Sequence, residues 1–316
     1  MDPASRSGNP IIPYLIVITG PTGIGKTELC ILLAEKYSSQ IISADSRQIY
    51  RELKTGTAAP SEDQLARAKH WFIANLSIHD YYNASMFEVE VTGLLEKLFK
   101  TSKIIFMTGG SGLYIDAVCR GIDVLPSVDM ELREELASCY RKYGIEWLRS
   151  KLKKVDPGHY GVVDLKNPNR MLKAIEISIM TGRPYSSFLT GKTKKRAFSI
   201  LKIGLRRDRK ELYGMINKRV DNMMKQGLMK EAEQLYRYRH LNALKTVGYR
   251  ELFDYMDGKT TLETAVELIK RNTRRYARRQ LTWLGRYNDI YWFHPDDHEG
   301  ICTLITNKTG IWPEQP

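Results

Sequence analysis

The chain has 316 residues, of which 42% are hydrophobic and 27% are charged, with a formal net charge of +13 at pH 7. This composition is typical of a folded globular protein and excludes a collagen, a coiled coil or a chain that is disordered throughout. No run of about 18 apolar residues occurs, which excludes a transmembrane helix.

The first ten residues lack the basic-then-apolar layout of a secretory leader. The chain has four cysteines, which are Cys30, Cys119, Cys139 and Cys302. None of them has the spacing of a metal clamp or a redox motif, and reduced thiols are usual in the cytosol. We therefore expect a cytosolic protein that does not enter a membrane.

Short apolar segments rich in β-branched residues are predicted to be buried strands, and they cover residues 14–19, 40–44, 103–108 and 198–205. Apolar residues with helical spacing follow the first strand over 28–37 and precede the third near 87–99. Strands that alternate with helices predict an α/β fold with a doubly wound parallel sheet.

The pattern of strands is interrupted over residues 122–198, where prolines separate helix-like stretches such as 131–143 and 170–180. We predict a helical insertion domain over 122–198, between a first part of the core (1–121) and a last part (199–316). The last part contains the final strand and basic helices, which are predicted over 211–226, 230–238 and 261–287.

The positive charge follows the same division of the chain. Residues 1–121 contain 12 Lys and Arg against 12 Asp and Glu, whereas residues 122–316 contain 37 against 24. A basic region beside a neutral one favours binding of a polyanion such as a nucleic acid. Solubility alone also accounts for a basic protein, so both interpretations stand at this point.

Residues 20–27, GPTGIGKT, follow the first predicted strand and open the first predicted helix, which is the context of a P-loop. Its glycines allow the backbone amides from Gly23 to Thr27 to converge, and the helix N-terminus adds positive potential. Lys26 would supply a point charge and Thr27 a hydroxyl for Mg²⁺. The motif predicts a phosphate-binding site and does not indicate whether its ligand is ATP.

Asp45 ends the second predicted strand and is the only acidic residue placed to face this loop. The chain shows no apolar strand that ends in a pair of carboxylates, as a nucleotide-hydrolysing P-loop protein would have. At the crevice of a doubly wound sheet, a strand-end aspartate acts as a metal ligand, a general base or a helix cap. The residues alone leave these three roles open.

Further motifs follow in order along the chain. They are ISADSRQIY at 42–50, GTAAP at 56–60, TGGSGLY at 108–114, Asn169-Arg170, RRDR at 206–209, INKRVDNM at 216–223, VGYRE at 247–251 and TRRYARRQLTW at 273–283. Together with the P-loop they span roughly 14–286, and in this combination they resemble the tRNA dimethylallyltransferases, also called tRNA isopentenyltransferases. Many families share the P-loop alone, whereas the combination is specific.

The resemblance implies that the P-loop does not bind ATP but holds the diphosphate of dimethylallyl diphosphate. It also implies Mg²⁺ as the cofactor. The acceptor would be the exocyclic amine of an adenosine at tRNA position 37, beside the anticodon. This base must leave its stack to react. The macromolecular partner would be the anticodon stem-loop, which would contact the insertion domain and the basic helices, and we expect the enzyme to be a monomer.

The same resemblance implies three catalytic residues. Asp45 would accept the proton of the adenine amine, while Lys26 and Arg219 would neutralise charge that grows on the leaving diphosphate. Without the resemblance, Arg219 would be interpreted as a solvated helix residue. The implied diphosphate-binding residues are Gly20, Pro21, Thr22, Gly23, Ile24, Gly25, Lys26 and Thr27, of which Thr27 would also contact the metal.

The implied tRNA-binding residues are Asp45, Ser46, Arg47, Gln48, Ser111, Arg133, Asn169, Arg170, Met171, Leu172 and Lys173. Arg170 and Lys173 lie three apart on a predicted helix, so one face carries both. The arginines of 271–279 form a second candidate RNA-binding face, with a solvated helix face as the alternative. Tyr249 and Trp283 are candidates to stack on bases, although burial in a core is the commoner role for such residues.

Three places depart from the family pattern. Ser111 stands where threonine is usual and keeps the hydroxyl. Ala59 replaces the usual lysine and removes one possible phosphate or tRNA contact. The stretch 70–74 lacks a second histidine and an aspartate, which leaves the detail of the prenyl pocket open.

Two other classes of protein fit part of the sequence. A P-loop kinase would explain residues 20–27 and Asp45, but it gives the basic region no role and predicts turnover of ATP. A non-catalytic RNA-binding protein gives Lys26 and Asp45 no role and predicts RNA affinity that survives loss of Lys26. An all-helical prenyl diphosphate synthase needs Asp-Asp-x-x-Asp motifs, and the only Asp-Asp pair, at 296–297, is followed by His-Glu-Gly, which excludes that class.

Overall fold

The computed structural model describes residues 12–126 and 129–314. By its internal contacts the chain divides into two units, and the second, Arg120–Lys194, interrupts the first. The sequence-based prediction placed this insertion over 122–198, and strand β5 begins at Ser199. Each unit is described here by itself.

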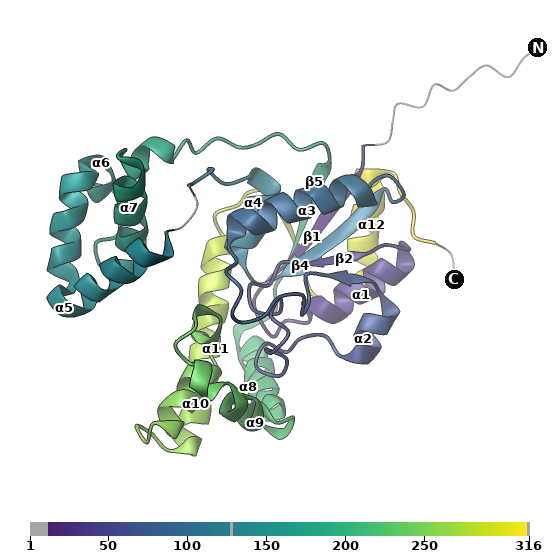
Figure 1. Cartoon of the computed structure of the whole chain (residues 1–316). Coiled ribbons are helices and arrows are strands. Elements are labelled where there is room, and N and C mark those ends of the chain that lie inside the picture. Colours follow the sequence, from purple (N-terminus) through teal and green to yellow (C-terminus); the bar gives the residue numbers. More distant parts are fainter. Residues whose placement is uncertain (1–11, 127–128, 315–316) are drawn as a thin grey trace, which may run out of the picture. The chain divides into compact units, whose positions relative to one another are not determined.

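The first unit is built on a sheet of six parallel strands in the order β3-β2-β4-β1-β5-β6, which confirms the predicted α/β fold (Figure 1). The strands are β1 (Tyr14–Thr19), β2 (Ile41–Ser43), β3 (His70–Trp71), β4 (Ile104–Gly109), β5 (Ser199–Leu205) and β6 (Ile290–Phe293). Strand β1 lies at the centre, where Thr19 is opposite Gly109 of β4 and Gly204 of β5. The carboxyl ends of these strands therefore meet at one edge of the sheet.

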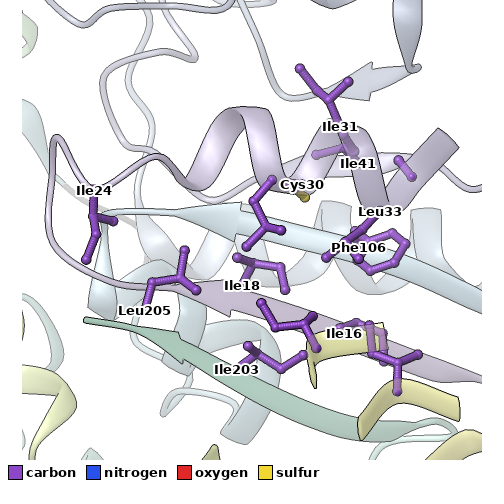
Figure 2. Packing of buried hydrophobic residues seen from close by; sticks show 14 of the residues in the cluster. Ile16, Ile18, Ile24, Cys30, Ile31, Leu33, Ile41, Phe106, Ile203 and Leu205 are labelled. Carbon is purple, nitrogen blue, oxygen red and sulfur yellow. The ribbon is translucent and has the colours of Figure 1, made fainter. Parts of the chain in front are cut away.

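Helices cover both faces of this sheet. Ile16 and Ile18 of β1 pack in one cluster with helices α1 (Lys26–Lys36) and α12 (His298–Thr309), together with Phe106 and Ile203 of the neighbouring strands (Figure 2). Leu15 and Val17 alternate with them and are also fully buried, because α3 (Ala84–Leu98) and α4 (Gly112–Arg120) lie over the other face. Continuous burial explains why β1 reads as an unbroken apolar run in the sequence.

The helices of the first unit include those predicted from the sequence. Their bounds are α1 (Lys26–Lys36), α2 (Glu62–Arg67), α3 (Ala84–Leu98), α4 (Gly112–Arg120), α8 (Arg209–Lys225), α9 (Leu228–Leu235), α10 (Tyr249–Met256), α11 (Leu262–Leu284) and α12 (His298–Thr309). The predicted helices are α1, α3, α8, α9 and α11. Strands β3 and β6 and the helices α2, α4, α10 and α12 were not predicted. Strand β3 has only two residues, and β6, although its residues are apolar and aromatic, is a short, partly exposed edge strand of four residues.

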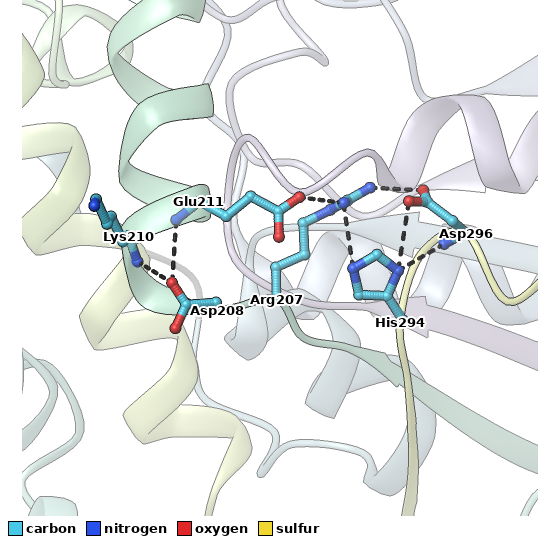
Figure 3. A network of polar contacts seen from close by, with 6 residues as sticks. All are labelled: Arg207, Asp208, Lys210, Glu211, His294 and Asp296. Carbon is cyan, nitrogen blue, oxygen red and sulfur yellow. Dashed lines mark hydrogen bonds and ion pairs between the residues drawn. The ribbon is translucent and has the colours of Figure 1, made fainter.

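A polar network fastens the end of β6 to the start of α8 (Figure 3). The Arg207 guanidinium donates from Nη2 to Asp296 at 2.7 Å and from Nη1 to His294 Nε2 at 3.3 Å, and it also contacts the Glu211 carboxylate. Pro295, between these partners, lies 4.0 Å from the point that a Cβ of Gly25 would occupy. The network therefore holds the segment 294–296 close to Gly25.

The second unit is a small helical domain with its own core. Its helices are α5 (Met130–Val155), α6 (Pro157–Tyr160) and α7 (Pro168–Thr181) (Figure 1). Leu148 and Leu152 of α5 pack against Met171 and Ile175 of α7. The predicted helix 131–143 stops where the structure kinks, at Gly144 with φ 76° and ψ −171°, and α5 continues beyond it.

None of the helices in the described part of the chain is long and apolar enough to cross a membrane.

Candidate active site

The loop between β1 and α1 carries the P-loop residues at the carboxyl edge of the sheet. Gly23 and Gly25 have φ angles of 80° and 103°, values that glycine adopts without the strain of a side chain. Gly25 is also the N-cap of α1, and because it has no side chain the first amides of the helix are left open to a ligand. An anion is therefore favoured at this helix end by both amides and dipole.

Lys26, the first residue of α1, folds back on this loop. Its Nζ donates to the carbonyl of Gly20 at 3.0 Å and to that of Pro21 at 2.8 Å. Burial and, to a lesser extent, the neighbouring Arg219 lower the pKa of Lys26 to about 7, while Asp45 opposes both effects. An incoming anion would restore the full charge of this lysine.

Asp45 follows β2 and fixes the turn after it. Its Oδ1 accepts hydrogen bonds from the backbone amides of Arg47 at 2.9 Å and Gln48 at 3.3 Å. Within residues 12–126 and 129–314, Oδ2 has no hydrogen-bond partner. One carboxylate oxygen therefore positions the group, as a turn cap does, while the other remains available for a proton or a metal.

Two cavities meet at this carboxylate. The phosphate cavity, of about 690 Å³, is lined by residues 22–27 and by one face of α8 that includes Lys218 and Asn222. The adjoining cavity, of about 330 Å³, is lined on one side by apolar residues such as Met223 and Ile269 and elsewhere by basic residues. Thr22, Asp45 and Arg219 line both cavities.

Arg219 reaches this boundary from α8. Its Nη2 donates to the carbonyl of Thr57 at 3.3 Å, and burial lowers the pKa of the guanidinium while Asp45 opposes this. The Gln48 side chain also donates to the Thr57 carbonyl, at 3.2 Å. The structure thus brings together Lys26 of α1, Asp45 after β2 and Arg219 of α8, which come from three separate segments of the chain.

The remaining core candidates lie around the same edge. The Ser111 hydroxyl accepts from the amide of Ser46 at 2.9 Å and donates to the Ser46 hydroxyl at 3.1 Å. Ser46 and Arg47 line the adjoining cavity, and Gln48 lines the phosphate cavity. Serine at position 111 therefore makes the contact that a threonine hydroxyl would make.

Sequence analysis missed two residues that shape the site. Gln280 of α11 bonds to both Thr22 and Gly110. Glu231 of α9 accepts from the amides of Lys54, Thr55 and Gly56 at 3.2, 2.8 and 2.9 Å. Gln280 lies within the motif at 273–283, but no sequence pattern indicates these contacts, because every partner is 170 or more residues away.

A magnesium ion fits the donors present, although they form no closed cage. Among residues 12–126 and 129–314, no three His, Cys, Asp or Glu side chains gather as a metal site. Mg²⁺ bound to a phosphorylated ligand needs only one or two protein oxygens, since phosphates and water complete its shell. The Thr27 hydroxyl and the Asp45 carboxylate both line the phosphate cavity and suit that arrangement.

Helix α11 carries the cluster of arginines predicted as an RNA-binding face. Arg271, Arg275, Arg278 and Arg279 are exposed, whereas Arg274 donates to Asn217 at 2.6 Å. Trp283 lies under Arg286, whose guanidinium is 3.7 Å from the ring centre. Tyr249 is fully buried, so the structure assigns it to the core and not to base stacking.

In the second unit, the candidates on α7 divide by face. Asn169, Arg170 and Lys173 are exposed, while Met171 is buried in the core of the unit and Leu172 packs against it. Arg133 of α5 forms an ion pair with the buried Glu176, with Nη2 to Oε2 at 2.8 Å. The exposed trio is therefore the part of 169–173 whose side chains reach solvent.

Comparisons with known proteins agree with one another. The family model described as IPP transferase matches residues 48–287. The chain is 51% identical to tRNA dimethylallyltransferase 1 of Bacteroides thetaiotaomicron, over 93% of this chain and 96% of that protein. It is 52% identical to tRNA dimethylallyltransferase 2 of Parabacteroides distasonis, over 93% and 98% of the two chains.

Solved structures are similar as well. The crystal structure of the tRNA isopentenylpyrophosphate transferase from Bacillus halodurans matches with a TM-score of 0.68 and 33% identity, over 94% of this chain and 96% of that one. A structure of a eukaryotic dimethylallyltransferase matches with a TM-score of 0.78 at 24% identity, over 96% and 81%, and supports the fold alone.

Proposed function

The chain belongs to the tRNA dimethylallyltransferase family, and we propose that it transfers the dimethylallyl group of dimethylallyl diphosphate to the exocyclic amine of the adenosine at tRNA position 37. One observation carries this proposal in the structure: Asp45 lies where the phosphate cavity meets the adjoining cavity, so one carboxylate faces both. A transferase that moves a group from a diphosphate to a base needs its proton acceptor at such a junction.

The diphosphate binds in the phosphate cavity. The open amides at the start of α1 and the Lys26 ammonium surround it. The Thr22 amide is engaged with Gln280, so Thr22 contributes through its hydroxyl. Thr27 would hold Mg²⁺, which would supply positive charge that stabilises the leaving group.

Transfer is a displacement at the first carbon of the allyl group. The bond from that carbon to the diphosphate oxygen breaks, and a bond to the adenine nitrogen forms. The nitrogen loses a proton, which Asp45 accepts, because the exocyclic amine of a purine is a weak nucleophile. Lys26 and Arg219 stabilise the negative charge that develops on the departing diphosphate.

The flipped adenine and the rest of the RNA contact the remaining candidate residues. Ser46, Arg47 and Arg279 line the adjoining cavity, where a base would enter. The exposed cations of α7 and α11 bind the phosphates of the anticodon stem-loop. In this proposal residues 122–198 are the tRNA-contacting domain of a monomeric, cytosolic enzyme.

The test is transfer of labelled dimethylallyl diphosphate to an unmodified anticodon stem-loop with Mg²⁺. Wild-type protein should label the RNA, and replacement of the target adenosine should abolish labelling. Asp45→Asn should lower the rate about 100-fold or more, because the proton acceptor is lost. Asp63→Asn, at an exposed acid of α2, serves as the matched control and should leave the rate unchanged.

One outcome would contradict the proposed activity, and another would contradict the role of Asp45 alone. Unlabelled RNA together with hydrolysis of ATP or transfer of its phosphate would identify a P-loop kinase or nucleotidase. Full labelling by Asp45→Asn would remove this carboxylate from the chemistry while leaving the transferase in place.

A further inference from the structure

We propose that Gln280 is a positioning residue that keeps the phosphate loop in register with the loop after β4, which carries Ser111, and through it with Asp45 after β2. The inference deepens the proposed function and rests on it, because the register concerns the same two substrates. Gln280 lies on α11 and is 7% exposed, yet its amide group faces two loops instead of the apolar core.

Both ends of this side chain are used. Its Oε1 accepts from the Thr22 amide at 2.8 Å, and its Nε2 donates to the Gly110 carbonyl at 2.8 Å. The orientation of the side-chain amide is unambiguous, since a backbone N–H only donates and a carbonyl only accepts. A single group therefore spans the loops that follow β1 and β4.

The loop after β4 packs closely against both Gln280 and the end of β2. A Cβ on Gly110 would lie 2.5 Å from Gln280 Nε2, and a Cβ on Gly109 would lie 2.2 Å from the Ala44 carbonyl. The Ser111 amide donates to that same carbonyl at 3.2 Å. Gln280 is thereby linked by short backbone contacts to residue 44, which precedes Asp45.

The consequence is a direct path between the groups that bind the diphosphate and the group that accepts the proton. Thr22 begins the segment that lines the phosphate cavity. Ser111 fixes the amide of Ser46, next to Asp45. A small displacement between a bound leaving group and a general base lowers the rate strongly, so the residue that fixes their separation controls the chemical step.

Gln280→Met tests this because methionine has a similar length and no hydrogen bonds. We expect kcat/KM for dimethylallyl diphosphate to fall about tenfold or more, through kcat as well as KM, while KM for the stem-loop RNA stays unchanged. Binding of inorganic pyrophosphate should weaken about fivefold, since the Thr22 amide is no longer held in place. Gln234→Met on α9 makes the same chemical change at an exposed site and should alter none of these.

Gln280→Glu tests the role of this residue through the pH dependence of the rate, which would not change if Gln280 were merely structural. A protonated glutamic acid accepts from the Thr22 amide and donates to the Gly110 carbonyl as glutamine does, whereas a carboxylate opposes that carbonyl oxygen. Burial and this contact favour the neutral acid. The rate of Gln280→Glu relative to wild type should therefore rise as the pH falls from about 8 to 6, by a factor of about 3 or more.

Other titrating groups near this amide do not confuse the ratio. Burial raises the pKa of Tyr276, whose hydroxyl also donates to the Gly110 carbonyl at 3.2 Å, so it stays protonated in this range. Lys26, whose pKa is about 7, titrates in this range in both proteins, so the comparison is made as a ratio to wild type. The corresponding ratio for Gln280→Met should not change with pH.

The outcomes separate this inference from the proposed function. A wild type that fails to label RNA removes the proposed function, while pyrophosphate binding still compares the Gln280 variants. If the wild type is active and Gln280→Met matches it in kcat, in KM and in pyrophosphate binding, the inference is wrong. If Gln280→Met only lowers the melting temperature and Gln280→Glu shows a flat ratio, Gln280 is a packing residue and the inference is likewise wrong.

Discussion

Lys26 of the phosphate loop and Lys173 of α7 are both candidate cations for a phosphorylated substrate, but their surroundings differ. Lys26 is enclosed, donates to two backbone carbonyls and has a pKa of about 7. Lys173 is exposed on a helical face beside Arg170. The first group is fixed before the substrate arrives, whereas the second remains solvated until it meets one.

The difference teaches what each region contributes. A fixed, enclosed charge loses little entropy when it binds and acts in a medium of low dielectric constant, so it stabilises a developing charge strongly. A solvated lysine attracts a polyanion over a distance and is screened by salt. Variants near the phosphate loop should therefore have large effects on the rate of transfer. Variants on α7 should have small, salt-dependent effects on RNA affinity.

Lys26→Met should give the largest loss. We expect kcat/KM for dimethylallyl diphosphate to fall about 100- to 1,000-fold, because an enclosed positive charge at the leaving group is removed. Lys218→Met changes an exposed lysine of α8 that lines the same phosphate cavity, and it should cost only a few-fold. Steady-state transfer assays measure both, and equal losses would show that enclosure of the charge is unimportant.

Glu231→Ala should destabilise the first unit. The Glu231 carboxylate accepts from three successive amides and from the hydroxyl of the buried Tyr249 at 2.7 Å. Removing it leaves these donors without their partner, and we expect the free energy of unfolding to fall by about 2–3 kcal/mol. Denaturant titration checks this against Glu233→Ala, a change at an exposed neighbour on α9. Similar losses of unfolding free energy in the two variants would contradict this role of Glu231.

Pyrophosphate binding should depend on pH through Lys26. Its pKa is about 7 in the free protein, and a bound anion raises it. Below pH 7 the lysine is already charged, whereas above pH 7 binding must take up a proton. The affinity should therefore weaken as the pH rises above 7, by up to about tenfold per pH unit until the pKa of the complex is reached.

Calorimetry of wild type beside Lys26→Met measures this effect, because titration of pyrophosphate itself is common to both proteins. The wild type should show the additional proton uptake and the variant should not. Parallel pH profiles would mean that Lys26 stays charged in the free protein.

The parts of the fold that local sequence determines were predictable. Strand β1 is buried on both faces and therefore appears as an apolar run, and the glycines of 20–25 are needed for the turn into α1. Asp45 was predictable as a strand-end acid, although its role as a turn cap through Oδ1 needed coordinates. These features depend on neighbours a few residues away.

Contacts between distant segments were not predictable from the chain alone. Gln280 meets Thr22 across 258 residues, and no periodicity or motif relates the two. Tyr249 was a candidate for base stacking, yet its ring fills the space beside Gly56, where a Cβ would lie 2.4 Å from it. A tyrosine in the sequence can be buried or exposed in the fold, and only tertiary packing distinguishes the two cases.

The smallest effects belong to α7. Arg170→Ala and Lys173→Ala should each weaken binding of the stem-loop RNA about three- to fivefold and reduce the slope of log affinity against log salt by about 0.7–0.9, one phosphate contact each. The rate at saturating RNA should stay unchanged, since neither residue belongs to the unit that contains Asp45. Binding measured across a salt series checks the slope.

Lys97→Ala, at an exposed lysine of α3 in the first unit, removes the same charge without touching α7 and is the control for the overall field. A slope that falls equally for Lys97→Ala would mean that net charge, and not this helical face, attracts the RNA. Arg133→Ala sharpens the contrast within the second unit. It leaves the buried Glu176 without its guanidinium, so its main effect should be on the stability of that unit and not on the salt slope.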